Sequence, residues 1–257
     1  MFRAHSSVLI TGASGGIGAA LARALATLQP ARMVLVGRRV ETLTALAAEL
    51  ACPTEICVAD IGIASGRSRV LSHLEGVDLL VNCAGFGSFG PFNQADADTQ
   101  QQMLEVNCVA PVVFTRAVLP FMKEQGHGCI VNIASGMGFQ PMPYMSTYAA
   151  SKAFLLHWSE GIAEELRNSG VRVVTVCPGT VHTGFAQAGA IPLAHMTGVP
   201  FLTVSVDAVV DGTMAALQKG RTVTRPGLGN WLATAFGRAV PRAVVRRVLG
   251  WGMRRDY

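Results

Sequence analysis

The chain has 257 residues, of which half are hydrophobic and 14% are charged, a composition that fits one large α/β domain with a substantial core. No apolar run reaches the length of a membrane span, the start leaves no room for a signal peptide, and no cysteine pair has zinc-site spacing. We therefore expect a cytoplasmic protein without a metal site. Residues 221–257 carry eight arginines and one acidic residue, whereas the other 220 residues carry 13 basic and 15 acidic side chains. This body lacks the basic surface of nucleic-acid-binding proteins.

A glycine-rich turn follows the first strand, which we expect near residues 8–10. It has the sequence TGASGGIG over residues 11–18 and opens a helix with leucines at positions 21, 25 and 28. Glycines let the backbone approach a pyrophosphate closely, and a helix N-terminus offers free N–H groups to it. The turn predicts a dinucleotide-phosphate site; the alternative is a flexible turn without a ligand.

The second strand, near residues 33–37, ends in Arg38 and Arg39. In dinucleotide sites an acidic residue at this place binds the ribose hydroxyls, whereas an arginine suits the 2′-phosphate of NADP. The pair favours NADP(H), with NAD(H) as the second choice; the alternative is two solvated arginines at a helix start. A third strand near residues 56–58 precedes Asp60, where a side chain could meet an adenine.

The fourth strand, near residues 77–81, ends in the sequence NCAG over residues 82–85. A long helix is expected over about 97–124, with Pro111 inside it. Because proline has no N–H, the carbonyl of Asn107 loses its helical partner. We therefore predict a bend at this place and an Asn107 carbonyl that is free to bind water; the alternative is a tolerated proline with no role.

A helix that begins near residue 146 follows the fifth strand, which runs over about 129–133 and leads into Ser135. It carries Tyr148 and Lys152, which are four positions apart and so share one face. A phenol titrates near pH ~10, and a nearby ammonium together with the helix dipole lowers that pKa. The pair predicts a tuned general acid/base, with Ser146 or Thr147 as the N-cap; the alternative is two residues that share a face by chance.

The remaining elements are a strand near 171–176, an apolar loop over 184–205, a helix over 206–219 and a short strand over 221–225. Strands that alternate with helices at this spacing predict a Rossmann fold, an α/β domain with one doubly wound parallel sheet of about seven strands and helices on both faces. We expect residues 1–225 to form this dinucleotide-binding and catalytic domain, and residues 226–257 a basic, amphipathic, helical tail.

Four motifs in this order resemble those of the short-chain dehydrogenases/reductases, over about residues 6–220. They are Thr11-Gly12-x-x-x-Gly16-x-Gly18, Asn82-x-Ala84-Gly85, Ser135 followed by Tyr148-x-x-x-Lys152, and Pro178-Gly179 followed by Thr183. The resemblance implies hydride transfer with four catalytic residues. These are Tyr148, which exchanges the proton at the substrate oxygen, Ser135, which binds that oxygen, Lys152, which tunes Tyr148, and Asn107, which holds a water.

The resemblance also implies a set of cofactor-binding residues, which includes Arg38 and Arg39. The expected cofactor-binding residues are Gly12, Ser14, Gly16, Ile17, Gly18, Arg38, Arg39, Asp60, Asn82, Ala84, Gly85, Tyr148, Lys152, Pro178, Gly179, Val181 and Thr183. Two positions depart from the family pattern: Cys83 replaces an asparagine, and Gly15 stands where many NADP-using relatives have a basic residue. The NADP expectation therefore rests on Arg38 and Arg39. We also expect a homodimer or homotetramer.

Apolar side chains after Gly85 and Ser135 are expected to line a substrate pocket. They are Phe86, Phe89, Phe92, Met137, Phe139, Met142, Tyr144 and Met145. This lining favours an apolar carbonyl compound such as a hydrophobic ketone or an acyl chain, and the alternative is ordinary core packing. The leading hypothesis is an NADPH-dependent carbonyl reductase. The alternatives are an NAD-dependent alcohol dehydrogenase and a regulator that binds dinucleotide without turnover; the complete catalytic set argues against the regulator.

The tail has apolar residues at helical spacing over 231–236, a break at Pro241, and a second apolar stripe over 244–251 among arginines. Such a basic amphipathic helix with tryptophan suits peripheral contact with an anionic membrane. The same pattern suits a helix docked on the body or on a second subunit. A third hypothesis is an arginine cluster that faces an acyl carrier protein or a phosphate-bearing substrate.

Overall fold

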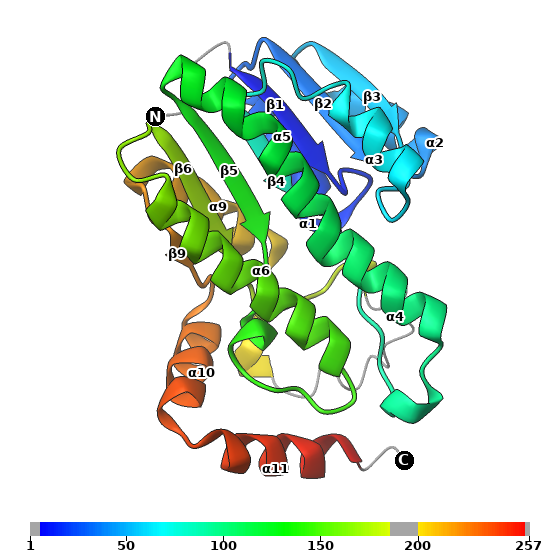
Figure 1. The fold of residues 1–257 in the computed structure, drawn as a ribbon, viewed down its shortest axis with the longest axis vertical. Coiled ribbons are helices and arrows are strands. Elements are labelled where there is room, and N and C mark those ends of the chain that lie inside the picture. Colours follow the sequence, from blue (N-terminus) through cyan, green and yellow to red (C-terminus); the bar gives the residue numbers. More distant parts are fainter. Residues whose placement is uncertain (1–5, 186–199, 255–257) are drawn as a thin grey trace.

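The computed structural model describes residues 6–185 and 200–254. Its centre is a sheet of seven parallel strands in the order β3-β2-β1-β4-β5-β6-β9 (Figure 1). The strands are β1 (Ser7–Thr11), β2 (Arg32–Gly37), β3 (Thr54–Val58), β4 (Leu79–Asn82), β5 (Gly128–Ile133), β6 (Val171–Val176) and β9 (Val223–Thr224). The predicted doubly wound parallel sheet is confirmed.

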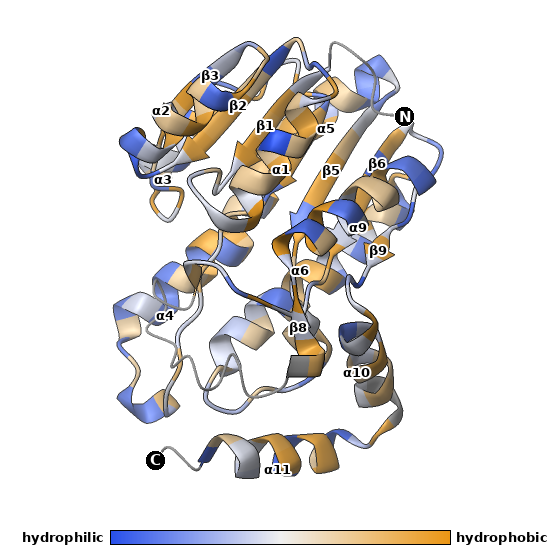
Figure 2. Cartoon of the chain, turned by 180° about the vertical axis from the view of Figure 1, so that it is seen from behind, coloured by the Kyte–Doolittle hydropathy of each residue, from blue (hydrophilic) through white to orange (hydrophobic). Residues whose placement is uncertain are grey.

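The central strands are apolar along their length, as expected for parallel strands that are covered on both faces (Figure 2). Successive side chains of a strand point to opposite faces. Val8 and Ile10 therefore belong to one hydrophobic core, while Leu9 between them belongs to the other. Each face of the sheet has its own layer of helices.

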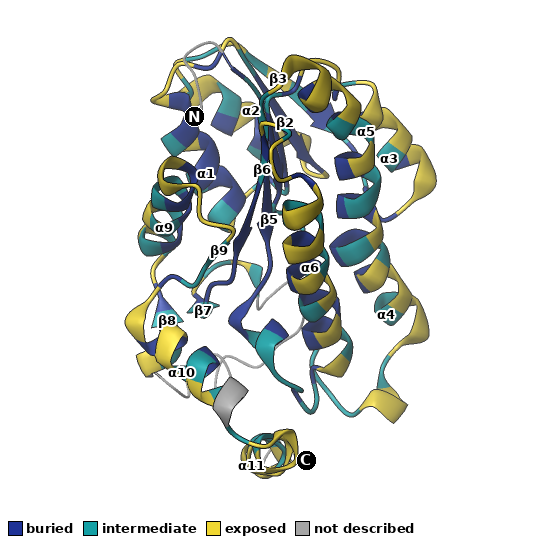
Figure 3. Cartoon of the chain, turned by 60° about the vertical axis from the view of Figure 1, so that its left-hand side comes forward, coloured by how far each residue is buried: buried dark blue, intermediate teal, exposed yellow. Residues whose placement is uncertain are grey.

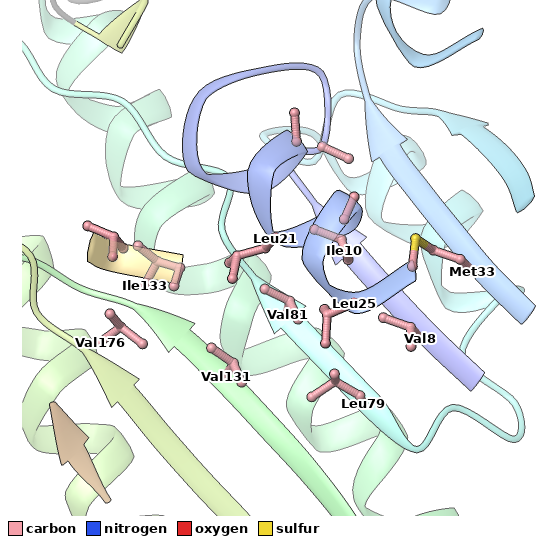
Figure 4. Packing of buried hydrophobic residues seen from close by; sticks show 14 of the residues in the cluster. Val8, Ile10, Leu21, Leu25, Met33, Leu79, Val81, Val131, Ile133 and Val176 are labelled. Carbon is pink, nitrogen blue, oxygen red and sulfur yellow. The ribbon is translucent and has the colours of Figure 1, made fainter. Parts of the chain in front are cut away.

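The helices are α1 (Gly16–Ala26), α2 (Val40–Glu49), α3 (Ala64–Leu71), α4 (Ala97–Leu104), α5 (Ala110–Gln125), α6 (Ser146–Glu165), α9 (Val206–Lys219), α10 (Leu228–Ala239) and α11 (Arg242–Met253). Buried residues of α1, α2 and α9 pack against the face that carries Val8, whereas those of α3 and α5 pack against the face of Leu9. Figure 3 shows α1 and α9 on one side of the sheet and α5 and α6 on the other. In Figure 4, Leu21 and Leu25 of α1 lie over the strand residues Val8, Leu79 and Val81.

The segment predicted as one helix over 97–124 consists of three pieces. A π-helical turn, Glu105–Val109, separates α4 from α5, and the Ala110 N–H bonds to the carbonyl of Glu105 instead of Val106. Pro111 lies two residues after this turn, so the predicted interruption lies where the missing N–H requires it. Residues 97–125 are long and apolar enough to cross a membrane by length and composition, although the sequence indicated no such run. Since Phe114 and Val118 are fully buried on the sheet, the segment serves as a core helix.

Two local predictions are wrong. The N-cap of α6 is Met145, without a side-chain hydrogen bond, so Ser146 and Thr147 lie inside the helix. The described part of the segment 184–205 is not only loop, because a short 3-10 helix, Pro200–Leu202, precedes β8 (Thr203–Val204). This strand pairs in parallel with β7 (Thr180–Val181), which makes a second, two-stranded sheet beside the cavity. The remainder of that segment lies outside the described residues.

The tail contains two helices with the break at Pro241, as the sequence indicated (Figure 1). α10 docks on the body through Asn230, which is 3% exposed and donates to the carbonyls of Cys177 and Pro226. Arg225, just before α10, lies over the rings of Phe139 and Trp231. The first helix of the tail therefore packs against the body of the protein.

Candidate active site

A cavity of about 750 Å³ lies at the carboxyl ends of the strands. Its walls come from the turn after β1, the ends of β2 to β6, the start of α6 and the segment around β7. The strand order reverses between β1 and β4, and such a reversal is where ligands bind in open α/β sheets. All the predicted cofactor-binding residues except Asn82 line this cavity.

The glycine-rich turn is held against the end of β4. Thr11 Oγ1 accepts hydrogen bonds from the backbone N–H groups of Cys83 and Ala84, at 3.1 and 3.2 Å. Gly12 has a φ of +71°, and a Cβ there would lie 2.7 Å from Ala84 Cα. A Cβ at Gly18 would overlap the Gly12 carbonyl oxygen. Only glycine fits these two positions, and the resulting cradle of bare backbone suits a pyrophosphate at the N-terminus of α1.

The two arginines after β2 have different surroundings. Arg39 Nη2 donates to the carbonyl of Ser14 at 2.8 Å, so this guanidinium supports the glycine-rich turn. Arg38 lines the cavity, and no carboxylate of the described residues pairs with it. Asp60 also lines the cavity, and its Oδ1 accepts from the Gly62 N–H at 2.9 Å. The open end of the cradle therefore carries an available positive charge.

Tyr148 is 7% exposed, and both Tyr148 and Ser135 line the cavity. Burial raises the pKa of the Tyr148 phenol to about 12, and the effect of the Ser135 side chain, which lowers this pKa, only partly opposes the shift. The sequence predicted that Lys152 would lower this pKa, which is wrong for the protein in this state. Burial is the largest cause of the shift, and the Lys152 ammonium lies 5.9 Å from the ring centroid. At neutral pH the buried phenol keeps its proton.

Lys152 is 4% exposed, and its Nζ donates to the carbonyl of Ile133 at 2.9 Å. Burial lowers the pKa of the ammonium to about 8, while the neighbouring Cys83 and Cys108 thiols act in the opposite direction. Its head is close to Gly85, where an added Cβ would come within 3.1 Å of Nζ. The cavity thus holds one amine whose charge titrates near physiological pH.

Asn107 does not line the cavity but positions two of its walls. Its Nδ2 donates to the Phe86 carbonyl and to Ser151 Oγ, both at 3.0 Å, and its Oδ1 accepts from the Phe86 N–H. Ser151 Oγ in turn donates to the carbonyl of Tyr148. The π-helical turn therefore anchors α6 and the segment after β4 through one amide.

Asn82 is buried in the sheet and does not line the cavity. Its Nδ2 donates to Asn132 Oδ1 at 2.8 Å, and Asn132 Nδ2 donates to Ser159 Oγ, also at 2.8 Å. This chain of polar groups ties β4, β5 and α6 together at the level of the catalytic residues. The predicted contact between Asn82 and the cofactor stays a prediction.

The end of the cavity beyond Tyr148 is apolar and has a wall that sequence reasoning missed. Met103, Met142 and Met145 form a buried cluster with Tyr148, and Leu249 and Met253 of α11 pack against it. Met253 also lines the cavity. The four-residue spacing of Leu249 and Met253 marks one face of α11, but a sequence does not show what that face covers.

Metal chemistry has no visible support in the described ranges, where no three His, Cys, Asp or Glu side chains are placed to hold an ion. The six cysteines are free thiols. The site therefore combines a backbone cradle, an arginine at its rim, and a tyrosine, lysine and serine at the boundary with an apolar pocket.

Residues 6–190 match the family model of the short chain dehydrogenases. The chain belongs to this family. It is 35% identical to ketoacyl reductase HetN of Nostoc sp. over 212 residues, which are 79% of this chain and 74% of that protein. The family's chemistry is that of oxidoreductases acting with NAD(P).

Solved structures of related enzymes resemble this one, and two of them illustrate the similarity. A short-chain dehydrogenase from Sphingobium yanoikuyae in complex with NADPH has a TM-score of 0.81 and 34% identity, covering 91% of this chain and 94% of that one. The bulky-bulky ketone specific alcohol dehydrogenase from Comamonas testosteroni has a TM-score of 0.76 and 28% identity, covering 91% and 92%.

Proposed function

We propose that this protein is an NADPH-dependent reductase of apolar ketones or aldehydes. The observation that carries the proposal is the buried Tyr148, whose phenol is protonated at neutral pH and faces an apolar pocket beside Ser135. A protonated phenol is a donor, which suits reduction better than oxidation.

The residues present fit NADP(H). The backbone cradle at Gly12 and Gly18 suits the pyrophosphate, and Arg38 suits the 2′-phosphate because an arginine fork pairs with phosphate oxygens. The relative from Sphingobium yanoikuyae binds NADPH. NAD(H) remains the second choice, because the end of β2 has no acidic residue to bind the ribose hydroxyls of NAD.

In the proposed reaction, bound NADPH supplies a hydride to the carbonyl carbon and is thereby oxidised. Tyr148 gives its proton to the carbonyl oxygen, so that the C=O becomes CH–OH. Ser135 donates a hydrogen bond to the same oxygen and orients it. The Lys152 ammonium stabilises the phenolate that remains, and Asn107 holds α6 and the Phe86 segment at the distance that this transfer needs.

The apolar cluster around Met142 and Met145 supports a hydrophobic substrate, since methionines adapt to ligands of varied shape. Two relatives act on related compounds, since one is a ketoacyl reductase and the other is specific for bulky ketones. A substrate with an acyl chain or two bulky substituents fits this pocket best.

We further infer two contacts outside the site. Phe121 of α5 and Phe154 of α6 are exposed on the outer faces of these helices, which supports a second copy of the chain there and hence a homodimer or homotetramer. Val244 and Val248 of α11 are exposed among arginines, which supports a peripheral contact with an anionic membrane.

A panel of ketones and aldehydes, followed by nicotinamide absorbance with NADPH and NADH, tests the proposal. We expect turnover with NADPH and a loss on the order of 100 to 10,000-fold in Tyr148→Phe, because the variant lacks the proton donor. Its NADPH affinity should stay within about twofold of the wild type. Preference for NADH would favour the alcohol dehydrogenase alternative, and tight NADPH binding without any turnover would favour the regulator.

A further inference from the structure

The hydrogen-bond ladder between β6 and β9 ends at a proline. The N–H of Thr175 donates to the carbonyl of Thr222 at 2.7 Å. Two residues further along both strands, the N–H of Cys177 donates to the carbonyl of Thr224 at 2.8 Å. In a parallel ladder the Cys177 carbonyl would next accept from residue 226 of the neighbouring strand. This residue is Pro226, which has no N–H, so the ladder offers the Cys177 carbonyl no donor.

The side chain of Asn230 supplies the missing donor. Its Nδ2 donates to the Cys177 carbonyl at 2.8 Å and to the Pro226 carbonyl at 3.0 Å. Asn230 lies in the first turn of α10, which follows β9 along the chain (Figure 1). Asn230 and Cys177 are 3% and 0% exposed, so bulk water does not satisfy this carbonyl in place of the amide. The amide therefore continues the ladder of β6 by one bond.

The same side chain packs against the loop that carries Ser135. A Cβ at Gly136 would overlap Asn230 Oδ1, and a Cβ at Gly179 would lie 3.2 Å from Asn230 Cβ. The N–H of Gly136 donates to the carbonyl of Pro178 at 2.7 Å. Asn230 thus lies behind the place where the Ser135 loop and the segment after β6 are hydrogen-bonded to each other.

Both of these segments form part of the catalytic cavity, since Ser135, Pro178 and Gly179 line it. Ser135 Oγ accepts the N–H of Met137 at 3.1 Å, which leaves its hydroxyl proton free to donate to a substrate oxygen. Hydride transfer requires the nicotinamide beside the carbonyl that Ser135 binds. The segment hydrogen-bonded to Gly136 is therefore expected to face the nicotinamide end of the cofactor.

We propose that Asn230 is a positioning residue for the reduction. Its amide takes the place of the N–H that Pro226 lacks, and it thereby holds residues 177–179 against the Ser135 loop. This inference rests on the proposed reductase function. Asn230 lies outside residues 6–190, which match the family model, so the family's motifs do not contain this contact.

The variant Asn230→Ser separates this role from the docking of α10. A serine has one proton and can donate it to the carbonyl four residues earlier, as Thr213 and Thr234 do in this structure. The variant therefore keeps a bond to Pro226 and loses the bond to Cys177. We expect kcat for ketone reduction to fall at least about tenfold, because the two segments are no longer held together.

Thr234→Val is the matched control for this variant. It removes a buried hydroxyl from the same helix, and Thr234 does not line the cavity. Its kcat should stay within about twofold of the wild type, and urea denaturation of both variants shows that they are folded under the assay conditions.

A second substitution tests whether the amide replaces a backbone N–H. Pro226→Ala restores this N–H, which can donate to the Cys177 carbonyl once Asn230 is replaced by serine. We expect kcat of the double variant, Pro226→Ala with Asn230→Ser, to recover to within about threefold of Pro226→Ala alone. If Asn230 only stabilised the fold, the double variant would be the less active of the two by the full effect of Asn230→Ser.

Equilibrium titrations locate the effect on the cofactor. NADPH carries the nicotinamide, whereas 2′,5′-ADP has only the adenosine end with its 2′-phosphate. Asn230→Ser should raise the Kd of NADPH about tenfold and leave the Kd of 2′,5′-ADP within about twofold. This split is not expected from a general loss of stability, which would weaken both ligands.

Four outcomes overturn the proposal: unchanged kcat in Asn230→Ser, an equal loss of kcat in Thr234→Val, no recovery in the double variant, or equal changes in the two Kd values. If no carbonyl compound oxidises NADPH, the reductase function fails. The titrations still decide in that case whether Asn230 acts on the nicotinamide end of the cofactor.

Discussion

Arg38 and Arg39 are adjacent in the sequence, but within residues 6–185 and 200–254 only Arg39 has a hydrogen-bond partner, the Ser14 carbonyl. We expect Arg38→Gln to raise KM for NADPH about tenfold and to leave KM for NADH within about twofold, because it removes a charged partner of the 2′-phosphate. Steady-state kinetics with both cofactors measures the effect. Arg39→Gln is the control and should weaken both cofactors alike, through the glycine-rich turn. An equal loss with both cofactors in Arg38→Gln would show that the phosphate binds elsewhere.

Lys152 should make the stability of the protein depend on pH. Its pKa falls from 10.5 to about 8 on folding, which corresponds to about 3 kcal/mol of destabilisation while the amine is charged. Between these pKa values the unfolded chain binds more protons than the folded one, so the free energy of unfolding rises with pH.

Urea denaturation of the wild type and Lys152→Met between pH 7 and 10.5 measures this contribution. We expect the wild type to gain about 3 kcal/mol relative to the variant across the range. The comparison cancels a cysteine that Lys152 does not influence, such as Cys129, whose raised pKa lowers stability above its ordinary range in both proteins. Parallel pH profiles of the two proteins would show that Lys152 is charged at an ordinary pKa.

At the scale of elements, two alanine substitutions separate two contributions to stability. One is the close contact between the glycine-rich turn and the end of β4, and the other is backbone strain at a positive φ. Gly12 and Gly76 have φ values of +71° and +69°, so alanine costs about 1 kcal/mol of strain at either. Only at Gly12 would the new Cβ meet a backbone, at Ala84, whereas Gly76 has nothing within 4 Å.

We therefore expect Gly12→Ala to cost about 1–3 kcal/mol more than Gly76→Ala, because the turn and β4 must separate. Urea denaturation measures the cost, and equilibrium titration should show weaker NADPH binding in Gly12→Ala alone. Equal stability of the two variants would mean that the turn is free to move away from β4.

At the scale of the whole molecule, α11 has two apolar faces. Leu249 and Met253 dock on the methionine cluster, while Val248 on the outer side is 61% exposed. We expect the full chain to co-sediment with phosphatidylserine liposomes, and salt to weaken this binding. Val248→Glu should abolish the binding, whereas Ile63→Glu, at an exposed residue of the body, should not. Sedimentation that both variants share, or that the full chain lacks, would exclude the membrane contact.

The sheet and most of the candidate site could be predicted from local pattern. Short apolar runs such as residues 171–176 are typical of parallel strands that are covered by helices on both faces of the sheet. A glycine-rich turn between a strand and a helix is typical of a dinucleotide-phosphate site. The interruption of the helix expected over 97–124 followed from one residue, since Pro111 has no N–H to donate, but the structure alone showed that it is a π-helical turn. These features depend on residues that are close together in the chain.

The sequence alone determined the family, the parallel sheet, the glycine-rich turn and the Tyr148–Lys152 pair, because each is a property of a short segment. Only the tertiary structure decided which groups share a site. It placed Met253 in the same cavity as Tyr148, although 105 positions separate them, and it paired the Asn82 side chain with Asn132 of the neighbouring strand. It also reversed the expected phenol pKa, since burial is a sum over distant neighbours that no spacing of two residues contains.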